Sequence, residues 1–321
     1  MRFDELKNAL KTQIDFAYFI VGKDFFLRSS AEKMITKRCV DSFLELNISK
    51  FNVENYSIES FLDALQLAPF GAEKRVVVLS EVNLSAQDQK KILKALEQKS
   101  DMVCVIFKYG EVTSQLAKIK DECTVVDCSP LDDEMLRSII VSKFSKNGIK
   151  IEPNAVQTLI DFTNGDMTFI DQEMKKLIAF AKDSKYISEK DVIELVHKNV
   201  EYSIFELSNA VADKNREKAI ELLDLMLANK ESPQNLLGML LANFRRIFYV
   251  SVSKESTSVL ASCLGVKEYS IKIAKRMALK FTPKKLKQIL DIGGQIDFDI
   301  KNSKMDDTDA IYYFVSNIIN L

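Results

Sequence analysis

Short runs of apolar, β-branched and aromatic residues recur through the first 130 residues, and helical patterns separate most of them. The runs lie at 16–21, 48–53, 75–80, 102–107 and 123–128, and the helical patterns at 25–40, 57–67, 85–98 and 112–120. Strands of near-continuous apolar character that alternate with helices are typical of a parallel sheet covered on both faces. We therefore expect residues 1–130 to form an α/β domain.

Helical periodicity replaces this alternation after residue 130, and the pattern there predicts no strand. Helix starts are marked by N-capping residues, by proline at the first helical position, or by a capping box. These signals are Ser129 with Pro130, Pro153, Asp166, and Ser188 with Asp191. We expect residues 131–200 to form a small helical domain.

A longer helical block follows and predicts a second all-α domain over residues 201–321. Its periodic segments lie at 203–212, 215–228, 233–250, 267–279, 283–300 and 306–320. The low content of helix-breaking residues, 9 Gly and 5 Pro in 321 residues, agrees with a predominantly helical chain.

The charge balance, the single histidine and the spacing of the cysteines exclude several classes of function. Lys and Arg number 45 against 46 Asp and Glu, so nucleic-acid binding through the whole surface is not expected. The single histidine, His197, excludes a multi-histidine metal site and stands at a helix end, where a structural role is expected. The five cysteines form no C-x-x-C pair, so no metal or cofactor is expected. With neither a signal peptide nor a membrane-length apolar run, the sequence predicts a cytoplasmic protein.

The first strand ends where a phosphate-binding loop would begin in a nucleotide-binding fold. The residues there are Gly22, Lys23 and Asp24, which lack the glycine spacing of such a loop and place a negative charge near the expected phosphate. The strand at 75–80 is followed by Glu81 alone, without the paired acidic residues that hold Mg²⁺. The layout is that of a nucleotide-binding domain, but we predict neither nucleotide binding nor catalysis.

The segment 65–75 joins an amphipathic helix to a buried strand and carries Leu67, Pro69 and Phe70. Two interpretations are open at this point. Phe70 either fills the core under the sheet, as most phenylalanines do, or is an exposed anchor for the pocket of a partner protein.

A cationic stretch near the C-terminus is the other candidate site. Lys272, Lys275, Arg276 and Lys280 are spaced so that they can share one helix face, and Lys284, Lys285 and Lys287 follow. A solvated helix face and a phosphate-contacting stripe explain this pattern equally well.

Several segments, taken in order, resemble the delta-subunit family of the bacterial DNA polymerase III clamp loader. No single motif is decisive. The segments have the order and spacing of the family, and together they extend over essentially the whole chain. They are GKDFFLRSSAEKM at 22–34, LAPFGAEKRVVVL at 67–79, NGDMTFIDQEMKKLIAFA at 164–181, ISEKDV at 187–192, SIFELSNAVADKNREKAIELL at 203–223, FTPKKLKQIL at 281–290 and DFDIK at 297–301.

The resemblance implies a degenerate AAA+-like domain, a helical lid and a helical collar that joins the motor and delta-prime subunits. It implies a chain without ATPase activity that binds and opens the sliding clamp for loading on primed DNA. The clamp-inserting pair of the family falls on Pro69 and Phe70, with Leu67 beside them. Pro69 replaces the leucine common there, so Phe70 is assigned the main contact. The absence of a zinc-binding cysteine cluster favours delta over the motor and delta-prime subunits.

Two other functions stay open on the sequence. One is a helical adaptor or regulator on a degenerate ATPase scaffold, which acts on DNA or protein without touching the clamp. The other is an ATPase with an atypical loop, which the sequence after the first strand disfavours. Binding to the cognate clamp and turnover of ATP distinguish these three functions.

Overall fold

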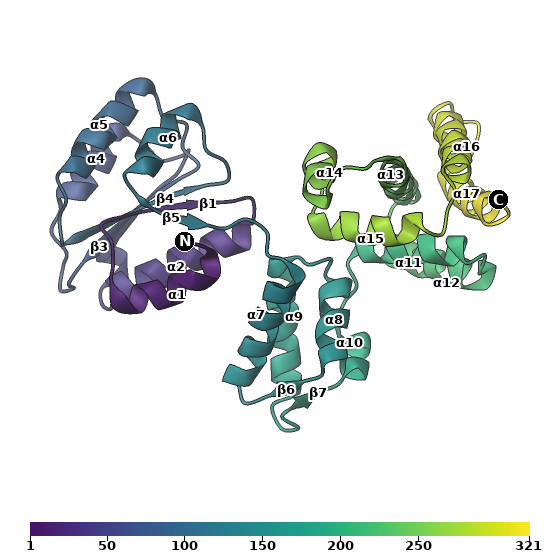
Figure 1. Cartoon of the computed structure of the whole chain (residues 1–321), viewed down its shortest axis with the longest axis horizontal. Helices are drawn as coiled ribbons and strands as arrows, with labels where there is room; N and C mark the ends of the chain where they lie inside the picture. Colours follow the sequence, from purple (N-terminus) through teal and green to yellow (C-terminus); the bar gives the residue numbers. More distant parts are fainter. The chain divides into compact units, whose positions relative to one another are not determined.

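The computed structural model describes all residues from 1 to 321 and separates into two compact units (Figure 1). The first unit spans Met1–Leu131 and the second Asp132–Leu321. The finer division into three domains, with ends at 130 and 200, stays a prediction.

The first unit is built on a five-stranded parallel sheet with the strand order β2-β3-β4-β1-β5. Each of the five predicted apolar runs coincides with one of its strands, and only β4 extends beyond its run, by two residues. They are β1 (Ala17–Val21), β2 (Ile48–Phe51), β3 (Arg75–Ser80), β4 (Val103–Tyr109) and β5 (Thr124–Asp127). Because parallel neighbours need crossover connections, at least one helix lies between every two successive strands, and these helices cover the sheet.

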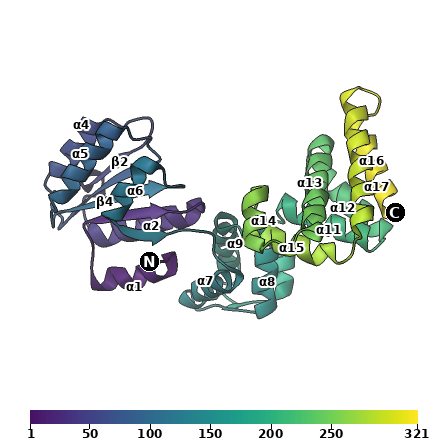
Figure 2. The ribbon, with the colours of Figure 1, turned by 45° about the horizontal axis from the view of Figure 1, so that its top comes forward.

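Helices cover both faces of this sheet, as expected (Figure 2). One face carries α1 (Phe3–Thr12) and α2 (Phe25–Cys39), and the other α4 (Ile58–Gln66), α5 (Ala86–Glu97) and α6 (Ser114–Asp121). Alternate residues of β4 serve the two faces. Val105 and Phe107 join the core beneath α4, α5 and α6, whereas Lys108 reaches a side chain of α2. The helix α1 was not predicted, because it buries only Leu6 and Leu10.

The second unit begins with α7 (Asp133–Lys146), α8 (Pro153–Phe162), α9 (Met167–Phe180) and α10 (Glu189–Leu195). The predicted starts of α8, α9 and α10 are confirmed. The predicted start at Ser129 and Pro130 is wrong, because α7 is capped by Asp132, whose carboxylate accepts a hydrogen bond from the Met135 amide at 2.9 Å. The expectation of no strand is also wrong: β6 (Lys150–Ile151) and β7 (Tyr186–Ile187) pair in parallel but are too short to show a period of two.

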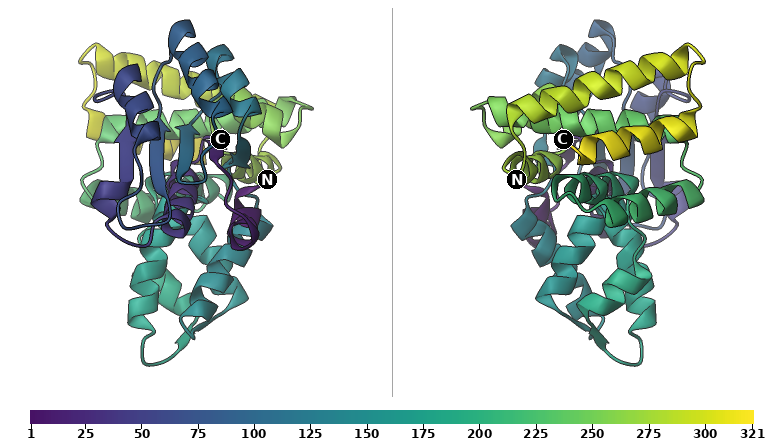
Figure 3. Two further views of the ribbon diagram at one scale, coloured as in Figure 1. Left: turned by 90° about the vertical axis from the view of Figure 1, so that its left-hand side faces the viewer. Right: turned by 90° about the vertical axis from the view of Figure 1, so that its right-hand side faces the viewer.

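Seven helices complete the second unit. They are α11 (Val200–Ala212), α12 (Arg216–Ala228), α13 (Pro233–Val252), α14 (Thr257–Leu264), α15 (Glu268–Ala278), α16 (Pro283–Lys301) and α17 (Asp307–Ile319). The sequence predicted six of them and missed the short α14. Helices α16 and α17, drawn in yellow, lie side by side in Figure 3.

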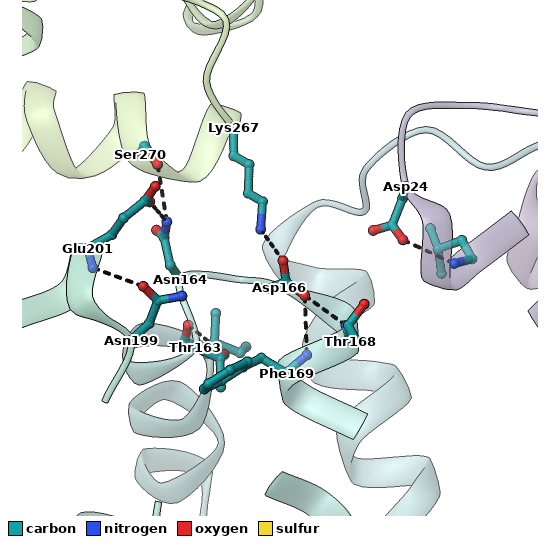
Figure 4. A network of polar contacts seen from close by, with 12 residues as sticks. Asp24, Thr163, Asn164, Asp166, Thr168, Phe169, Asn199, Glu201, Lys267 and Ser270 are labelled. Atoms are coloured by element: carbon teal, nitrogen blue, oxygen red, sulfur yellow. Dashed lines mark hydrogen bonds and ion pairs between the residues drawn. The ribbon is translucent and has the colours of Figure 1, made fainter. Parts of the chain in front are cut away.

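Polar side chains connect the turn before α9 to α11 and α15 (Figure 4). Asp166 accepts hydrogen bonds from the amides of Thr168 and Phe169 at the start of α9, and its other carboxylate oxygen lies 2.7 Å from Lys267 Nζ. Burial of Asp166 opposes its ionisation, but these donors outweigh that effect and lower the pKa of its carboxyl group. Asn164 donates to the Glu201 carboxylate and to the Ser270 hydroxyl. These bonds link the turn before α9 to the starts of α11 and α15, which lie on the other side of residue 200 in the sequence.

Candidate functional site

The amino edge of the sheet brings together two segments that are more than twenty residues apart in the sequence. Strands β2 and β3 are parallel neighbours in which Ile48 is opposite Val76, so the residues that precede the two strands meet at one edge. The segment before β2 contains the short helix α3 (Leu44–Asn47), and the segment before β3 is 67–74. The Ser42 hydroxyl donates to the Gly71 carbonyl at 2.7 Å and joins them.

The three residues singled out before β3 lie in this edge segment, and two of them are largely exposed. The Phe70 side chain is 59% exposed and Leu67 is 55% exposed, whereas Pro69 is partly buried. The interpretation of Phe70 as a core residue of its own chain is therefore wrong. Burial of a phenyl ring contributes about 1.5–3 kcal/mol, and here most of that free energy is still available for contact with another molecule.

The position of Phe70 is set by two residues of the other segment. The Asn47 side chain is fully buried; its Oδ1 accepts a hydrogen bond from the Phe70 amide at 2.7 Å, and its Nδ2 donates to the Phe70 carbonyl at 2.8 Å. The phenyl rings of Phe43 and Phe70 meet edge to face, with centroids 5.3 Å apart and an interplanar angle of 81°. The peptide of Phe70 is therefore held while its phenyl ring stays exposed.

Sequence reasoning missed the segment before β2. Phe43, Leu44 and Leu46 are all more than half exposed there, although they are large and apolar. The run is too short to show helical periodicity. The hydrogen bonds of Asn47 to residue 70 join positions far apart in the sequence, so no local pattern predicts them. We call Phe43, Leu44, Leu46, Leu67 and Phe70 together the apolar edge. An exposed apolar cluster of this kind is typical of a protein-interaction site.

The carboxyl edge of the same sheet is where a nucleotide would bind in an α/β fold of this layout. Only Gly22, Lys23 and Asp24 lie between β1 and α2, and Asp24 caps the helix by accepting a hydrogen bond from the Leu27 amide at 3.0 Å. Gly22 has a φ of +146°, and a Cβ atom there would lie 2.2 Å from the carbonyl carbon of Cys128. This connection is a tight turn against the neighbouring backbone, not an open cradle for phosphates.

Charged side chains of α2 pair with residues of the sheet at and beside this edge. Arg28 binds Glu81, which follows β3, and Glu32 binds Lys50 of β2 at 2.6 Å and Lys108 of β4. Glu32 is 5% exposed. Its burial disfavours the charged form, but the hydrogen bonds from Lys108 and Lys50 prevail and lower the pKa of its carboxyl group. The helix that would bind phosphate is thus held to the sheet by ion pairs.

Comparisons with known proteins agree with this architecture. The family model described as "DNA polymerase III, delta subunit" matches residues 18–129, and the model described as "DNA polymerase III delta subunit, C-terminal domain" matches residues 201–318. The chain belongs to the DNA polymerase III delta-subunit family.

Individual members of the delta-subunit family match along most of the chain. The DNA polymerase III subunit delta of Bacillus subtilis is 24% identical over 95% of this chain and 93% of its own length. The probable subunit delta of Aquifex aeolicus is 23% identical, with 83% of this chain and 85% of its own length covered. The solved structure of the Bacillus subtilis DNA clamp loader delta protein superposes with a TM-score of 0.77 over 99% of this chain and 100% of that chain, at 20% identity.

The fold class predicted from the sequence is confirmed: an α/β unit with a parallel sheet precedes the helices, as in the solved delta-subunit structure.

The cationic residues of this delta-subunit family member lie on or beside α15. Lys272 pairs with Asp133 at 3.2 Å, Lys280 pairs with Asp213 at 2.9 Å, and Lys275 donates to the Thr257 hydroxyl. Arg276 is exposed and makes no ion pair. The structure therefore places these cations on or just after one helix, and of the four Lys275 and Arg276 make no ion pair.

No group of three or more His, Cys, Asp or Glu side chains is arranged to hold a metal ion. His197 is exposed just after α10. No helix combines the length and the apolar character that a membrane crossing requires.

Proposed function

We propose that this chain is the clamp-loader delta subunit that binds and opens a sliding clamp in the cytoplasm. Phe70 is the main contact, and Leu67 and Pro69 belong to the same surface. The helices after residue 200 join the motor and delta-prime subunits, and the assembled loader places the clamp on primed DNA. The observation that carries the proposal is the exposed phenyl ring of Phe70, held in place at the amino edge of the sheet.

Opening follows if the clamp binds the apolar edge more tightly in one conformation than in another. A ligand shifts an equilibrium only by its difference in affinity for the two states. If the pocket that accepts Phe70 fits better when the adjacent clamp interface is distorted, insertion of the phenyl ring favours the open clamp. No nucleotide on this chain is needed for that shift.

Binding of the purified chain to its cognate sliding clamp tests the proposal directly. We expect a stable complex in size-exclusion chromatography and a measurable dissociation constant by surface plasmon resonance. A folded chain that does not bind the clamp contradicts the proposal and favours the adaptor function, in which the same scaffold acts on DNA or another protein.

We also propose that this chain neither binds nor hydrolyses ATP, so that nucleotide acts through companion subunits. The tight turn at Gly22 and the ion pair between Arg28 and Glu81 support this, because they occupy the edge where phosphates would bind. Isothermal calorimetry of the isolated chain with Mg²⁺-ATP is expected to show no binding heat. A micromolar dissociation constant, or turnover by the purified chain, contradicts this prediction.

The cations on and just after α15 are proposed to contact DNA in the assembled loader, and Arg276 is tested first because it is exposed and makes no ion pair. Loss of one phosphate contact lowers the slope of log affinity against log salt by about 0.9. Arg276→Ala is therefore expected to weaken binding of the loader to primed DNA and to reduce that slope by about 1. Lys254→Ala, at an exposed position between α13 and α14, is the control and leaves the slope unchanged. An unchanged slope in Arg276→Ala contradicts the contact.

A further inference from the structure

A single buried side chain satisfies both backbone polar groups of Phe70. Asn47 Oδ1 accepts from the Phe70 amide, and Asn47 Nδ2 donates to the Phe70 carbonyl. The side-chain amide thus pairs with the peptide of residue 70 much as a neighbouring strand does. Asn47 Nδ2 also donates to the carbonyl oxygens of Ser42, at 3.1 Å, and Phe43, at 3.3 Å. Asn47 therefore connects the two segments of the apolar edge through four contacts.

The backbone on both sides of this connection has an unusual conformation. Phe43 has a φ of +48°, which bulky residues rarely adopt, and Gly71 has a φ of +59°. A Cβ atom at residue 71 would lie 2.9 Å from Cε2 of Phe43, so glycine also allows the phenyl ring of Phe43 to approach. Such conformations persist only where surrounding contacts hold them, and the hydrogen bonds of Asn47 and Ser42 are those contacts.

We propose that Asn47 is a positioning residue for clamp binding, which holds Phe70 in its binding conformation before the clamp arrives. The inference rests on the proposed function of Phe70. Asn47 is fully buried and does not itself touch the clamp. A binding site that is already ordered avoids the loss of backbone and side-chain entropy on association. When only a fraction of the molecules is competent, the apparent dissociation constant rises by the inverse of that fraction.

The rate constants of clamp binding distinguish positioning from contact. Asn47→Ala in the full chain is expected to lower the association rate constant about 10-fold, because fewer molecules present Phe70 correctly. The dissociation rate constant is expected to stay within about 2-fold, because the bound phenyl ring makes the same contacts. Phe70→Ala, which removes the contact itself, is expected to act mainly on the dissociation rate constant. Surface plasmon resonance on the immobilised cognate clamp measures both.

Tyr109→Phe is the matched control for stability. Tyr109 lies in the core of the same unit, and its hydroxyl donates one buried hydrogen bond to the Val82 carbonyl at 3.1 Å. This variant loses a buried hydrogen bond without touching the apolar edge, so both rate constants are expected to match those of the wild type. Hydrogen exchange of the Phe70 amide is expected to be faster in Asn47→Ala and unchanged in Tyr109→Phe.

Each outcome decides between the two proposals. If folded Asn47→Ala binds at wild-type rates, or changes only the dissociation rate constant, Asn47 is not a positioning residue while the role of Phe70 stands. If Phe70→Ala leaves both rate constants unchanged, the clamp contact is not at Phe70 and the proposed function fails first. Asn47→Asp, which keeps the acceptor for the Phe70 amide but loses the donor, replaces the alanine variant if that variant does not fold, and the same criteria apply to it.

Discussion

Phe70→Ala is expected to weaken binding of the cognate sliding clamp about 100-fold. Aromatic anchors at the centre of an interface contribute about 2–4 kcal/mol, and a 100-fold change in affinity corresponds to about 2.8 kcal/mol. The Phe70 side chain is mostly exposed in the free chain, so its removal costs the fold little. The far-UV circular dichroism spectrum and the melting temperature are expected to stay close to those of the wild type.

Phe25→Ala is the matched control for this prediction. Phe25 is also an exposed phenylalanine of the first unit, 67% accessible, but it opens α2 at the carboxyl edge of the sheet. Its replacement is expected to leave clamp affinity unchanged. Equal losses of affinity in the two variants would show that clamp binding does not depend on the apolar edge. Unfolding of Phe70→Ala would show that the phenyl ring supports the fold.

Glu32→Ala is expected to cause the largest loss of stability, about 3 kcal/mol in the free energy of unfolding. Glu32 is buried between α2 and the sheet, where it binds Lys108 and Lys50. Removing one partner of a buried ion pair leaves the other charge without compensation, which costs about 3–5 kcal/mol. The value is placed at the low end because the Lys50 side chain is largely exposed. Urea denaturation followed by circular dichroism measures the difference.

The stabilisation by Glu32 is also expected to depend on pH. The pKa of Glu32 is lower in the folded chain than in the unfolded one, so the ionised carboxylate stabilises the fold above the ordinary glutamate pKa of about 4.3. This stabilisation is lost as the pH falls through the lower, folded value. The difference in stability between wild type and Glu32→Ala is therefore expected to be constant near neutrality and to shrink below about pH 4.3. A difference that grows in acid contradicts the assignment.

Glu59→Ala is the control for the burial of Glu32. Glu59 and Lys91 form an exposed ion pair in the same unit, with 3.5 Å between the charged atoms. Exposed pairs contribute about 0–1 kcal/mol because water and salt screen them. Each variant removes one glutamate carboxylate from the same unit. The difference between their losses of unfolding free energy therefore measures the effect of burial.

The strands of the first unit and most helix starts were predictable, because their signals are local. Five apolar runs mark five strands, and the caps at Asp166 and Ser188 lie where their side chains accept backbone hydrogen bonds. The errors arose where a second capping residue was available nearby, or where an element was too short to show a periodic pattern. Asp132 caps α7 in place of the predicted start at Ser129, and the two-residue strands β6 and β7 have no detectable period.

The candidate site was predictable only in part. The resemblance of the segment 67–79 to the delta-subunit family pointed to Phe70 as an exposed anchor, whereas the usual burial of phenylalanine by itself favoured the core. Asn47 and Phe43 had no signal in the sequence, because their partners lie 23 and more residues away along the chain. The cationic spacing on α15 was visible in the sequence, whereas the carboxylates that compensate Lys272 and Lys280 were not.

Two features of this protein are properties of the sequence itself: a sheet-forming first part with no phosphate loop, and a helical remainder. They depend on side-chain type and on spacing over a few residues, which determine strand, helix and cap. Tertiary structure alone decided that Phe70 faces outward and that a buried amide holds its peptide. Those outcomes depend on which strands become neighbours, because pairing of β2 with β3 brings Asn47 and Phe70 together at one edge of the sheet.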